Sequence, residues 1–333
     1  MYFSIIIPVF NRPGEVQELL DSLALQEYGA PFEIIIVEDG STIDCKTVVN
    51  NFKQILDITY IYKENSGPGD SRNYGMHRAK GDYYIIFDSD CVIPKTYLTD
   101  VAKNLSKNYY ECFGGPDDAQ KSFSNIQKAI NYSMTSIFTT GGVRGGVANL
   151  SAFEPRSFNM GLSKKAFQLS GGFGNIHPGE DPDLTMRLWK LGFKTTLFSN
   201  AFVYHKRRID WKKFFVQVNK FGKARPILNL WHPTYKKITY FFPTLFVLGF
   251  YFSVLICFFT TAIFLSLYFV YFTIIFLHAT YLNKSGIVGI LSIQATAIQF
   301  FGYGTGFLKS YVQTNVLKRK PENVFPELFY KKK

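Results

Sequence analysis

The chain has 333 residues, enough for one large domain with a smaller second part, and 47% of them are hydrophobic. Its net charge of +12 comes largely from basic residues on both sides of a nearly uncharged segment, which favours an anionic membrane surface over a nucleic-acid groove. The four cysteines are scattered without a CxxC pair, so neither a disulfide framework nor a zinc site is expected, and a reducing compartment is favoured.

Strand-like and helix-like segments alternate through the first half of the chain. Continuous apolar, β-branched runs predict strands of a sheet covered on both faces, at residues 3–9, 32–37, 58–62 and 83–87. Apolar residues at helical spacing predict helices over residues 11–25 and 69–79. This order predicts an α/β fold whose ligand site lies beyond the carboxyl ends of the strands.

Acidic residues follow two of the predicted strands. Glu38 and Asp39 come after the second strand, and Asp88 and Asp90 come after the fourth. The two carboxylates of Asp88-Ser89-Asp90 can face one hard cation, and Mg²⁺ or Mn²⁺ in turn bridges phosphate oxygens. Such an ion would act as a Lewis acid on a departing diphosphate. An ordinary acidic turn is the alternative for this short motif taken alone.

A second acidic segment precedes another predicted helix. Pro182 fits the first helical position of that helix, and Asp181 fits the cap before it. Asp181 therefore has two candidate roles, a helix cap or a general base that takes the proton from an attacking hydroxyl. Glu180 is the alternative base. His205 could complete the shell of a metal ion or be a structural histidine.

The sequence after these motifs changes character. The glycine-rich residues 141–146 lack the ending of a phosphate-binding P-loop, so we expect a plain loop or a mobile loop near the acceptor. Residues 211–221 combine an aromatic, apolar face with several lysines, which predicts an amphipathic helix in the membrane surface.

The nearly uncharged segment predicts transmembrane helices. Residues 238–258 and 259–282 are each long enough to cross a bilayer, which needs about 20 apolar residues. Residues 286–308 are a weaker third candidate because they contain Gln294, Gln299 and several glycines. Two crossings with one re-entrant or interfacial segment would keep both basic flanks in the cytosol, whereas three crossings would not. We therefore expect an even number.

Six motifs resemble glycosyltransferase family 2 in order and spacing, across about residues 3 to 208. The motifs are SIIIPVFNRP, IIIVEDGS, NSGPGDSRNYG, FDSDC, FNMGLSKKAF with GGF, and GEDPDLTMRLWKLGFK. The resemblance implies a GT-A fold, which is a Rossmann-like domain that binds nucleotide-diphospho-sugars. It also implies metal-dependent transfer with inversion at the anomeric carbon.

The resemblance further implies roles for individual residues. Asp39 would bind the nucleobase, Asp88 the ribose, and Asp181 would be the general base. The residues that would line the donor pocket with them are Pro8, Val9, Asn11, Arg72, Asn73 and Ser89. The ligands expected for Mn²⁺ or Mg²⁺ are Asp90, Asp88 and His205. The residues expected near the transferred sugar or the acceptor are Asn159, Met160, Gly161 and Trp189.

Processive members of the family carry the motif Q-x-x-R-W near the predicted interfacial helix. Here the corresponding run starts at Gln217 and has Lys220 in place of the arginine and Phe221 in place of the tryptophan. Lysine cannot reproduce the two parallel hydrogen bonds of a guanidinium group. We therefore expect transfer of one sugar per reaction, with a processive polysaccharide synthase as the alternative.

The prediction is thus a membrane-anchored, inverting glycosyltransferase that moves a sugar from a UDP- or GDP-sugar to a lipid-linked or polysaccharide acceptor. Its expected segments are a GT-A catalytic domain at 1–210, an interfacial helix and linker at 211–237, transmembrane helices at 238–308 and a basic cytosolic tail at 309–333. No leader is visible, so we expect a multi-pass protein of a bacterial cytoplasmic membrane whose catalytic domain faces the cytosol.

Two other classes of protein compete with this prediction. A non-catalytic membrane scaffold that binds a nucleotide-sugar would have no use for the acidic pair Glu180 and Asp181. A nucleotidyltransferase would carry a glycine-rich, basic signature after the first strand, which PVFNRPGE does not show. Both classes are therefore less favoured than the transferase.

Overall fold

The structure is a computed structural model of the whole chain, and it describes residues 1–118, 123–141, 153–205 and 210–330. The chain forms two compact units. The α/β unit comprises residues 1–118, 148–206 and 329–333, and the helical unit comprises residues 119–147 and 207–328. These units differ from the consecutive segments expected from the sequence, because residues 119–147 join the helices and the last residues return to the α/β unit.

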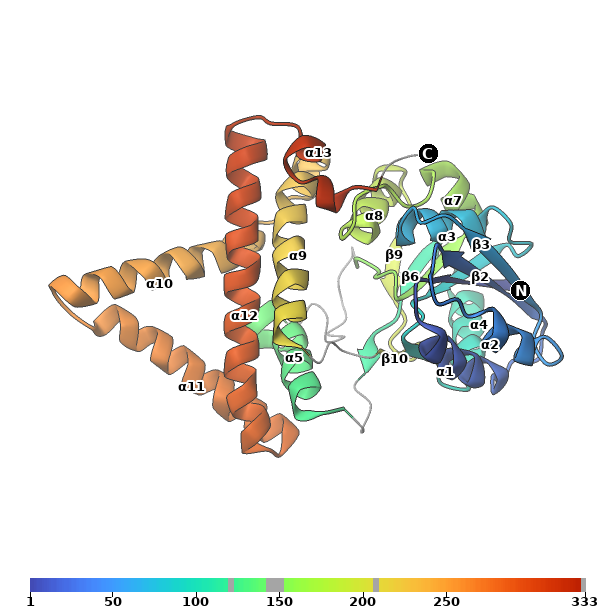
Figure 1. The fold of residues 1–333 in the computed structure, drawn as a ribbon, viewed down its shortest axis with the longest axis horizontal. Helices are drawn as coiled ribbons and strands as arrows, with labels where there is room; N and C mark the ends of the chain where they lie inside the picture. Colours follow the sequence, from blue (N-terminus) through green and yellow to red (C-terminus); the bar gives the residue numbers. More distant parts are fainter. Residues whose placement is uncertain (119–122, 142–152, 206–209, 331–333) are drawn as a thin grey trace. The chain divides into compact units, whose positions relative to one another are not determined.

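The main sheet of the α/β unit contains, among the described residues, seven strands in the order β3-β2-β1-β4-β8-β6-β9 (Figure 1). Their bounds are β1 Phe3–Val9, β2 Phe32–Asp39, β3 Ile58–Lys63, β4 Tyr83–Phe87, β6 Cys112–Gly114, β8 Asn159–Ser163 and β9 Thr195–Leu197. Strand β1 pairs in parallel with β2 and β4, and β2 pairs in parallel with β3. Strand β8 runs antiparallel to both of its neighbours, β4 and β6. The predicted α/β class is confirmed, with a mixed sheet.

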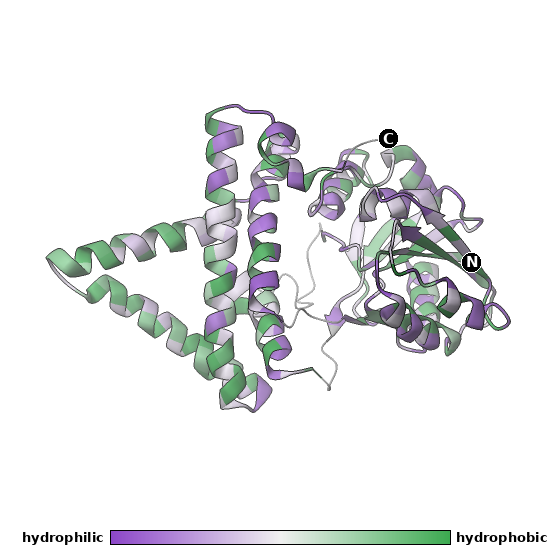
Figure 2. Cartoon of the chain, viewed as in Figure 1, coloured by the Kyte–Doolittle hydropathy of each residue, from purple (hydrophilic) through white to green (hydrophobic). Residues whose placement is uncertain are grey.

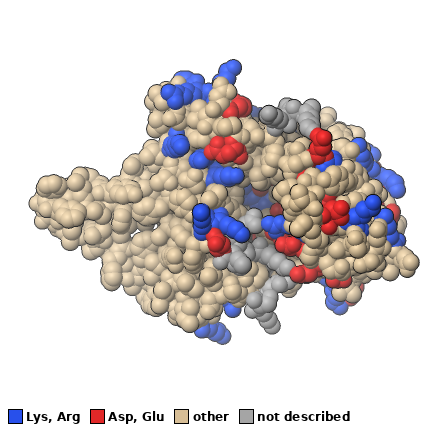
Figure 3. All heavy atoms as spheres, viewed as in Figure 1, with Lys and Arg blue, Asp and Glu red and all other residues tan. Residues whose placement is uncertain are grey.

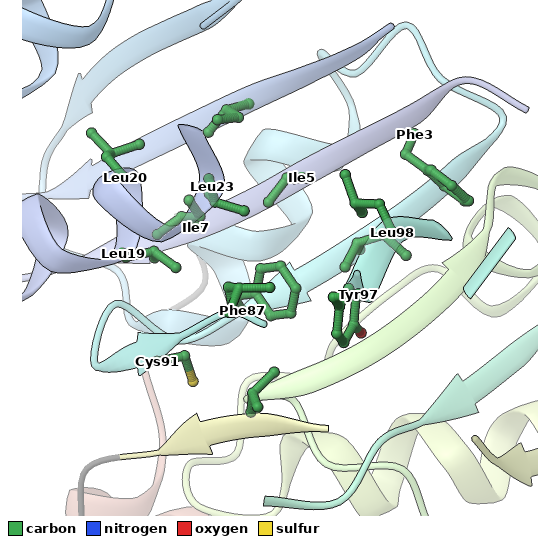
Figure 4. Packing of buried hydrophobic residues seen from close by; sticks show 14 of the residues in the cluster. Phe3, Ile5, Ile7, Leu19, Leu20, Leu23, Phe87, Cys91, Tyr97 and Leu98 are labelled. Atoms are coloured by element: carbon green, nitrogen blue, oxygen red, sulfur yellow. The ribbon is translucent and has the colours of Figure 1, made fainter. Parts of the chain in front are cut away.

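Helices cover both faces of this sheet, which explains why its central strands are apolar without alternation. The helices are α1 Pro13–Ala24, α2 Lys46–Phe52, α3 Pro68–Met76, α4 Tyr97–Lys107, α7 Lys164–Ser170 and α8 Glu180–Lys190. On one face, Ile5 and Ile7 of β1 pack against Leu19 of α1 and Leu98 of α4 (Figure 4). On the other face, Ile6 packs among residues of α3, α7 and α8. The carboxyl ends of β1, β2 and β4 are thereby held at one edge.

A second, small sheet in the α/β unit has the order β5-β10-β7 within the described ranges. Its strands are β5 Cys91–Val92, β7 Asp117–Asp118 and β10 Val203–His205. His205 pairs with Cys91 across β10 and β5, and Val203 pairs with Asp117 across β10 and β7. Pairing in this sheet therefore places His205 beside Cys91, the residue that follows Asp88-Ser89-Asp90.

The helical unit consists mainly of long helices. Its main described helices are α5 Asn125–Thr135, α6 Ile137–Thr140, α9 Trp211–Trp231, α10 Phe242–Phe259, α11 Ile263–Asn283, α12 Gly286–Tyr311 and α13 Pro321–Val324. Helices α9 and α12 lie side by side, whereas α10 and α11 extend from α12 to a common turn (Figure 1). Apolar residues predominate along α10 and α11, and their visible face shows no charged side chain (Figures 2 and 3).

The helical unit refines several boundaries expected from the sequence. Helix α9 continues ten residues beyond 221 with Pro226 inside it, so the interfacial helix and the predicted linker are largely one element. The first two apolar helices are separated at residues 260–262. Residues 309–328 are not an extended tail, since they finish α12 and form short helical segments. Of the glycine-rich segment, only Gly141 lies within the described residues.

Candidate active site

Asp39 ends strand β2 and is fixed by the loop that precedes α3. Its Oδ1 atom accepts hydrogen bonds from Lys63 Nζ at 2.5 Å and from the Ser66 backbone N–H at 2.9 Å. Its Oδ2 atom accepts from the Gly67 backbone N–H at 2.9 Å. The side chain is buried, with 5% of its surface exposed. Hydrogen-bond donors on both oxygens thus set the orientation of the Asp39 carboxylate.

Residues at the end of β1 shape the neighbouring loop. Asn11 has a positive φ of 55°, and its Oδ1 atom accepts hydrogen bonds from the backbone N–H groups of Thr42 and Ile43, each at 2.9 Å. Pro8 and Val9 are buried, and the Val9 side chain belongs to the core. The side chain of Asn11 therefore holds the loop after β2 in place. Since the Val9 side chain is in the core, only the backbone of Val9 could contact a bound nucleotide-sugar.

Arg72 joins the two acidic segments of the α/β unit. It lies on α3, its Nη2 atom is 2.7 Å from Asp88 Oδ1, and its Nη1 atom is 3.0 Å from Glu180 Oε1. Its side chain is only 3% exposed and lies over the ring of Phe173. Burial acts to lower the pKa of Arg72, but the carboxylates of Asp88 and Glu180 raise it. The guanidinium group stays charged at the edge where β4 ends and α8 begins.

Glu180 is the most constrained carboxylate of the site. It is buried and lies within 3.1 Å of His177 Nδ1 through both of its oxygens, and Oε2 also accepts from the Gly179 backbone N–H. Burial acts to raise the pKa of Glu180, but His177, the backbone N–H and Arg72 lower it to about 2. The same contact raises the pKa of His177 against the opposing effect of its burial. Glu180 is therefore ionised and a weak base.

Asp181 occupies the first turn of α8, not its cap. The helix begins at Glu180 and its N-cap is Gly179, with no side-chain hydrogen bond at the cap. The expected start at Pro182 was therefore two residues late, because Gly179 has a φ of 124° that a side chain would disfavour. The Asp181 carboxylate is 15% exposed and has Arg156 Nη1 at 3.5 Å from its Oδ2 atom.

Asp90 and His205 form the best candidate for a cation site. Asp90 Oδ1 lies 3.2 Å from His205 Nε2, and Asp90 Oδ2 accepts from Arg12 Nη1 at 3.0 Å. Among the described residues, potential ligand atoms of Asp90, Cys91 and His205 lie within 4.8 Å of one another. The carboxylate oxygen of Asp90 is the kind of ligand that Mn²⁺ and Mg²⁺ prefer, whereas an imidazole nitrogen is more typical of softer divalent metals, so the fit to a hard cation rests mainly on Asp90.

Two neighbours of this pair are less suited to bind the ion directly. Burial, followed by the charges of Asp90 and Asp88, raises the pKa of the Cys91 thiol well above its ordinary value, and sulfur is a softer ligand than Mn²⁺ or Mg²⁺ prefers. The ring of Phe158 stacks on His205 at a centroid distance of 4.8 Å and holds the imidazole plane. Asp88 points to Arg72 in this structure, and it is not among the clustered ligand atoms of the described residues.

Other predicted residues have clear structural roles. Asn159 is buried, donates to Ala201 O at 2.8 Å and accepts from Tyr97 O–H at 2.5 Å. Met160 is part of the core, and a Cβ atom on Gly161 would overlap the ring of Phe113. Asn73 forms two hydrogen bonds with the backbone of Phe173. The indole N–H of Trp189 donates a hydrogen bond to the Thr195 hydroxyl, and Ser89 is buried.

The structure adds four polar residues that were not singled out from the sequence. They are Arg12, Lys63, Arg156 and His177, which contact Asp90, Asp39, Asp181 and Glu180 respectively. Lys63 directly follows the strand predicted at residues 58–62, and Arg12 lies within the motif SIIIPVFNRP, so their positions gave a signal. Arg156 and His177 lie in irregular segments and gave none.

Comparison with known proteins identifies the family of this region. Residues 4–168 match a family profile described as Glycosyl transferase family 2. The poly(ribitol-phosphate) beta-N-acetylglucosaminyltransferase TarS of Staphylococcus aureus is 32% identical over 112 residues, which are 33% of this chain and 20% of TarS. Hyaluronan synthase of Pasteurella multocida is 27% identical over 236 residues, covering 61% of this chain and 24% of the synthase. The chain thus spans less than a quarter of the length of these relatives.

Solved structures share the fold at low sequence identity. S. aureus TarS 1–349 in complex with UDP-GlcNAc has a TM-score of 0.50 at 19% identity, covering 94% of this chain and 92% of that chain. The mannosyltransferase PcManGT from Pyrobaculum calidifontis, in complex with GDP-Man and Mn²⁺, has a TM-score of 0.56 at 14% identity, with coverage of 96% and 88%. The expected GT-A fold is confirmed by these similarities.

Proposed function

Because the chain belongs to glycosyltransferase family 2, we propose that it transfers a sugar from a nucleoside diphosphate-sugar to a hydroxyl group of a membrane-delivered acceptor. The observation that carries this proposal is the bridge of Arg72 between Asp88 and Glu180. A fixed guanidinium group beside the ends of parallel strands suits the oxygens of a diphosphate. UDP-GlcNAc and GDP-Man, bound by two proteins of similar fold, support a UDP- or GDP-sugar as the donor.

The donor would lie across the edge of the sheet. The Asp39 carboxylate would accept a hydrogen bond from an N–H group of the nucleobase. The Asp88 carboxylate would accept a hydrogen bond from a hydroxyl group of the ribose. Hydrogen bonds to both oxygens of Asp39 fix the carboxylate before the nucleotide binds, which reduces the conformational entropy lost on binding. Arg72 would then lie beside the diphosphate with its charge retained by Glu180.

Asp90 and His205 would hold Mn²⁺ or Mg²⁺. When bound, the ion supplies positive charge that stabilises the departing diphosphate. Arg12 is the cationic partner of Asp90 in this structure, and it would have to yield one carboxylate oxygen to a bound cation. Phe158 keeps the His205 ring in the orientation in which its Nε2 atom faces Asp90.

Asp181 would be the general base. Inverting transfer needs one base opposite the leaving group, which removes the proton from the acceptor hydroxyl as its oxygen attacks the anomeric carbon. Glu180 is the weaker candidate, because its pKa of about 2 and its contacts with Arg72 and His177 leave it little affinity for a proton. Arg156, 3.5 Å from Asp181, would orient the base.

The direct experiment uses Asp181→Asn, with Asp21→Asn on the exposed face of α1 as the matched control. Full-length protein is assayed with a panel of UDP- and GDP-sugars, with Mn²⁺ or with EDTA. We expect Asp181→Asn to lower kcat by about 10²- to 10⁴-fold, the usual contribution of a general base, while nucleotide affinity is kept. Full turnover in Asp181→Asn would exclude this base, and nucleotide binding without turnover in the wild type would favour a scaffold.

We propose that α10 and α11 cross the membrane as a hairpin while α9 and α12 lie at its surface. The two hairpin helices have 18 and 21 residues, which corresponds to roughly 27 and 32 Å, about the thickness of the hydrocarbon core. Their side chains are largely exposed, as at Phe258 with 81% and Tyr281 with 79%. A hairpin makes the number of crossings even, as the basic flanks require.

The packing of α12 supports a surface position for this third apolar helix. Asn219 of α9 donates to Gly302 O at 2.9 Å, and Gly306 lies against the backbone of Asn219. Lys220 of α9 therefore lies level with residues 302–306, in the second half of α12. A transmembrane α12 would draw this lysine toward the hydrocarbon region of the bilayer, where a charged side chain costs up to about 3 kcal/mol. At the surface, its ammonium group would face anionic lipid headgroups.

This arrangement is tested with single thiol probes in a Cys257→Ala background, since the other three cysteines are buried. Leu248→Cys on α10 and Lys220→Cys on α9 are labelled with an environment-sensitive dye in reconstituted vesicles. We expect lipid-borne quenchers to reach the dye at residue 248 and water-soluble quenchers to reach the dye at residue 220. Equal protection of both dyes from water-soluble quenchers would contradict a surface position for α9 and α12.

A further inference from the structure

Tyr330 packs onto the α/β unit between two loops of the candidate active site. Its backbone N–H donates to Asn175 O at 3.0 Å, and the preceding Phe329 forms an isolated β-bridge with Ile176. A Cβ atom on Gly67 would overlap the Tyr330 ring, so the ring lies directly on that glycine. The ring of His177 is 6.1 Å away between centroids. Tyr330 therefore touches residues from both loops.

Each of these loops holds one carboxylate of the site. The Gly67 backbone N–H donates to Asp39 Oδ2, and the side chain of Asn65 donates to Asp39 O at 2.8 Å. In the other loop, His177 contacts both oxygens of Glu180. Gly67 has a φ of 94°, so its conformation is one that other residues rarely adopt. An added contact from Tyr330 would stabilise that conformation.

We propose that Tyr330 is a positioning residue of the donor site, because its ring holds the Asp39 loop and the Glu180 loop together. This inference rests on the proposed function for its effect on nucleotide binding. Through Gly67 it fixes the carboxylate that would bind the nucleobase, and through His177 it fixes the carboxylate that pairs with Arg72. The ring acts by packing, since Gly67 offers it only backbone surface.

The test compares full-length wild type with Tyr330→Ala and Tyr330→Phe. The matched control is Tyr109→Ala, since Tyr109 is a tyrosine of the same unit that is 55% exposed. Hydrogen exchange without nucleotide reports on residues 64–67 and 175–179. Titration calorimetry with UDP and with GDP, each with Mn²⁺, reports on affinity. Donor KM and kcat are measured separately.

We expect Tyr330→Ala to raise exchange in both loops and to weaken binding of the preferred nucleotide by roughly two- to tenfold, the range for one lost aromatic packing contact. Donor KM should rise with it, kcat should change less, and Tyr330→Phe should restore both values. Unchanged exchange in Tyr330→Ala, or a change in only one loop, would overturn the proposal. If the wild type binds neither UDP nor GDP, the proposed function fails, and the exchange data still decide whether Tyr330 joins the loops.

Discussion

Arg72 donates a hydrogen bond to Glu180 at 3.0 Å across 108 residues of sequence, and both side chains are nearly fully buried. The second branch of the same guanidinium group reaches Asp88 at 2.7 Å. One side chain of α3 thus ties the end of β4 to the start of α8. Arg72 thereby holds together two acidic segments, at Asp88 and at Glu180, that are distant in the sequence.

Removal of Arg72 should destabilise the α/β unit. In Arg72→Met, the buried Glu180 keeps its charge without its cationic partner on α3, so we expect the free energy of unfolding to fall by about 3 to 5 kcal/mol. Arg72→Lys should recover only part of this loss, because one ammonium group cannot replace the guanidinium fork. Thermal unfolding of the purified protein measures the effect. The matched control Arg78→Met, at an exposed position just after α3, should stay close to wild type.

The pair formed by Glu180 and His177 should give stability a defined dependence on pH. The pKa of Glu180 is lowered to about 2 in the folded state, so its contribution is present above the unfolded value of 4.5 and is lost as pH falls below it. The pKa of His177 is raised above 6.5, so its contribution is present below 6.5 and is lost as pH rises through the folded value.

Together the two groups contribute most between about pH 4.5 and 6.5. His177→Gln should remove the decrease in folding stability on the alkaline side. It should also shift the decrease on the acid side toward higher pH, since Glu180 would lose one of its cationic contacts. Thermal unfolding midpoints measured from pH 3 to pH 9 report on both the acid and the alkaline decrease in stability. The exposed His77→Gln variant should keep the wild-type profile, and an unchanged profile in His177→Gln would refute this explanation.

Binding of a divalent cation should depend on Asp90 and not on its neighbour Cys91. We expect Asp90→Asn to weaken Mn²⁺ binding by at least about tenfold, because it removes the charged oxygen ligand. Cys91→Ala should leave the affinity within about twofold, since the sulfur of this buried residue is a softer ligand than Mn²⁺ prefers. Electron paramagnetic resonance of free Mn²⁺ measures both constants. A strong loss in Cys91→Ala would assign the thiol to the metal shell.

Close packing of α9 and α12 should depend on individual glycines. A Cβ atom on Gly306 would overlap the backbone oxygen of Asn219, whereas one on Gly286 would meet no atom within 4 Å. We therefore expect Gly306→Ala to lower the free energy of unfolding in detergent by about 1 to 3 kcal/mol through forced separation of the helices. Gly286→Ala is the control and should be neutral or slightly stabilising. Equal midpoints for the two variants would argue against close contact at Gly306.

The elements of the first half could be predicted well because their signals are local. The runs FSIIIPV and YYIIF fill strands whose two faces are both covered, and their bounds were predicted to the residue. The start of α8 was not, because Pro182 suggested a first helical position that the unusual backbone of Gly179 moved two residues earlier. Backbone angles at a glycine are set by its tertiary surroundings, and a single sequence does not reveal them.

The acidic residues of the site could also be named from sequence, but their partners could not. Asp39, Glu180 and Asp181 occur in recognisable motifs, whereas Arg156 and His177 lie in segments without periodicity. Their contacts arise only when distant loops meet. Asn159 and Met160 are buried in strand β8, and their expected position near the sugar or the acceptor stays a prediction.

Strand β8 lies between β4 and β6, although it follows both of them in the chain. On the ribosome, residues 1–118 can therefore assemble only a parallel half-sheet that ends in the apolar edge of β4, and this edge stays unpaired until residues 159–163 emerge. Exposed apolar edges recruit other chains, so we expect nascent protein at this stage to be prone to aggregation. A fragment that stops before β8 should accordingly be insoluble, even though it contains Asp39, Asp88 and Asp90.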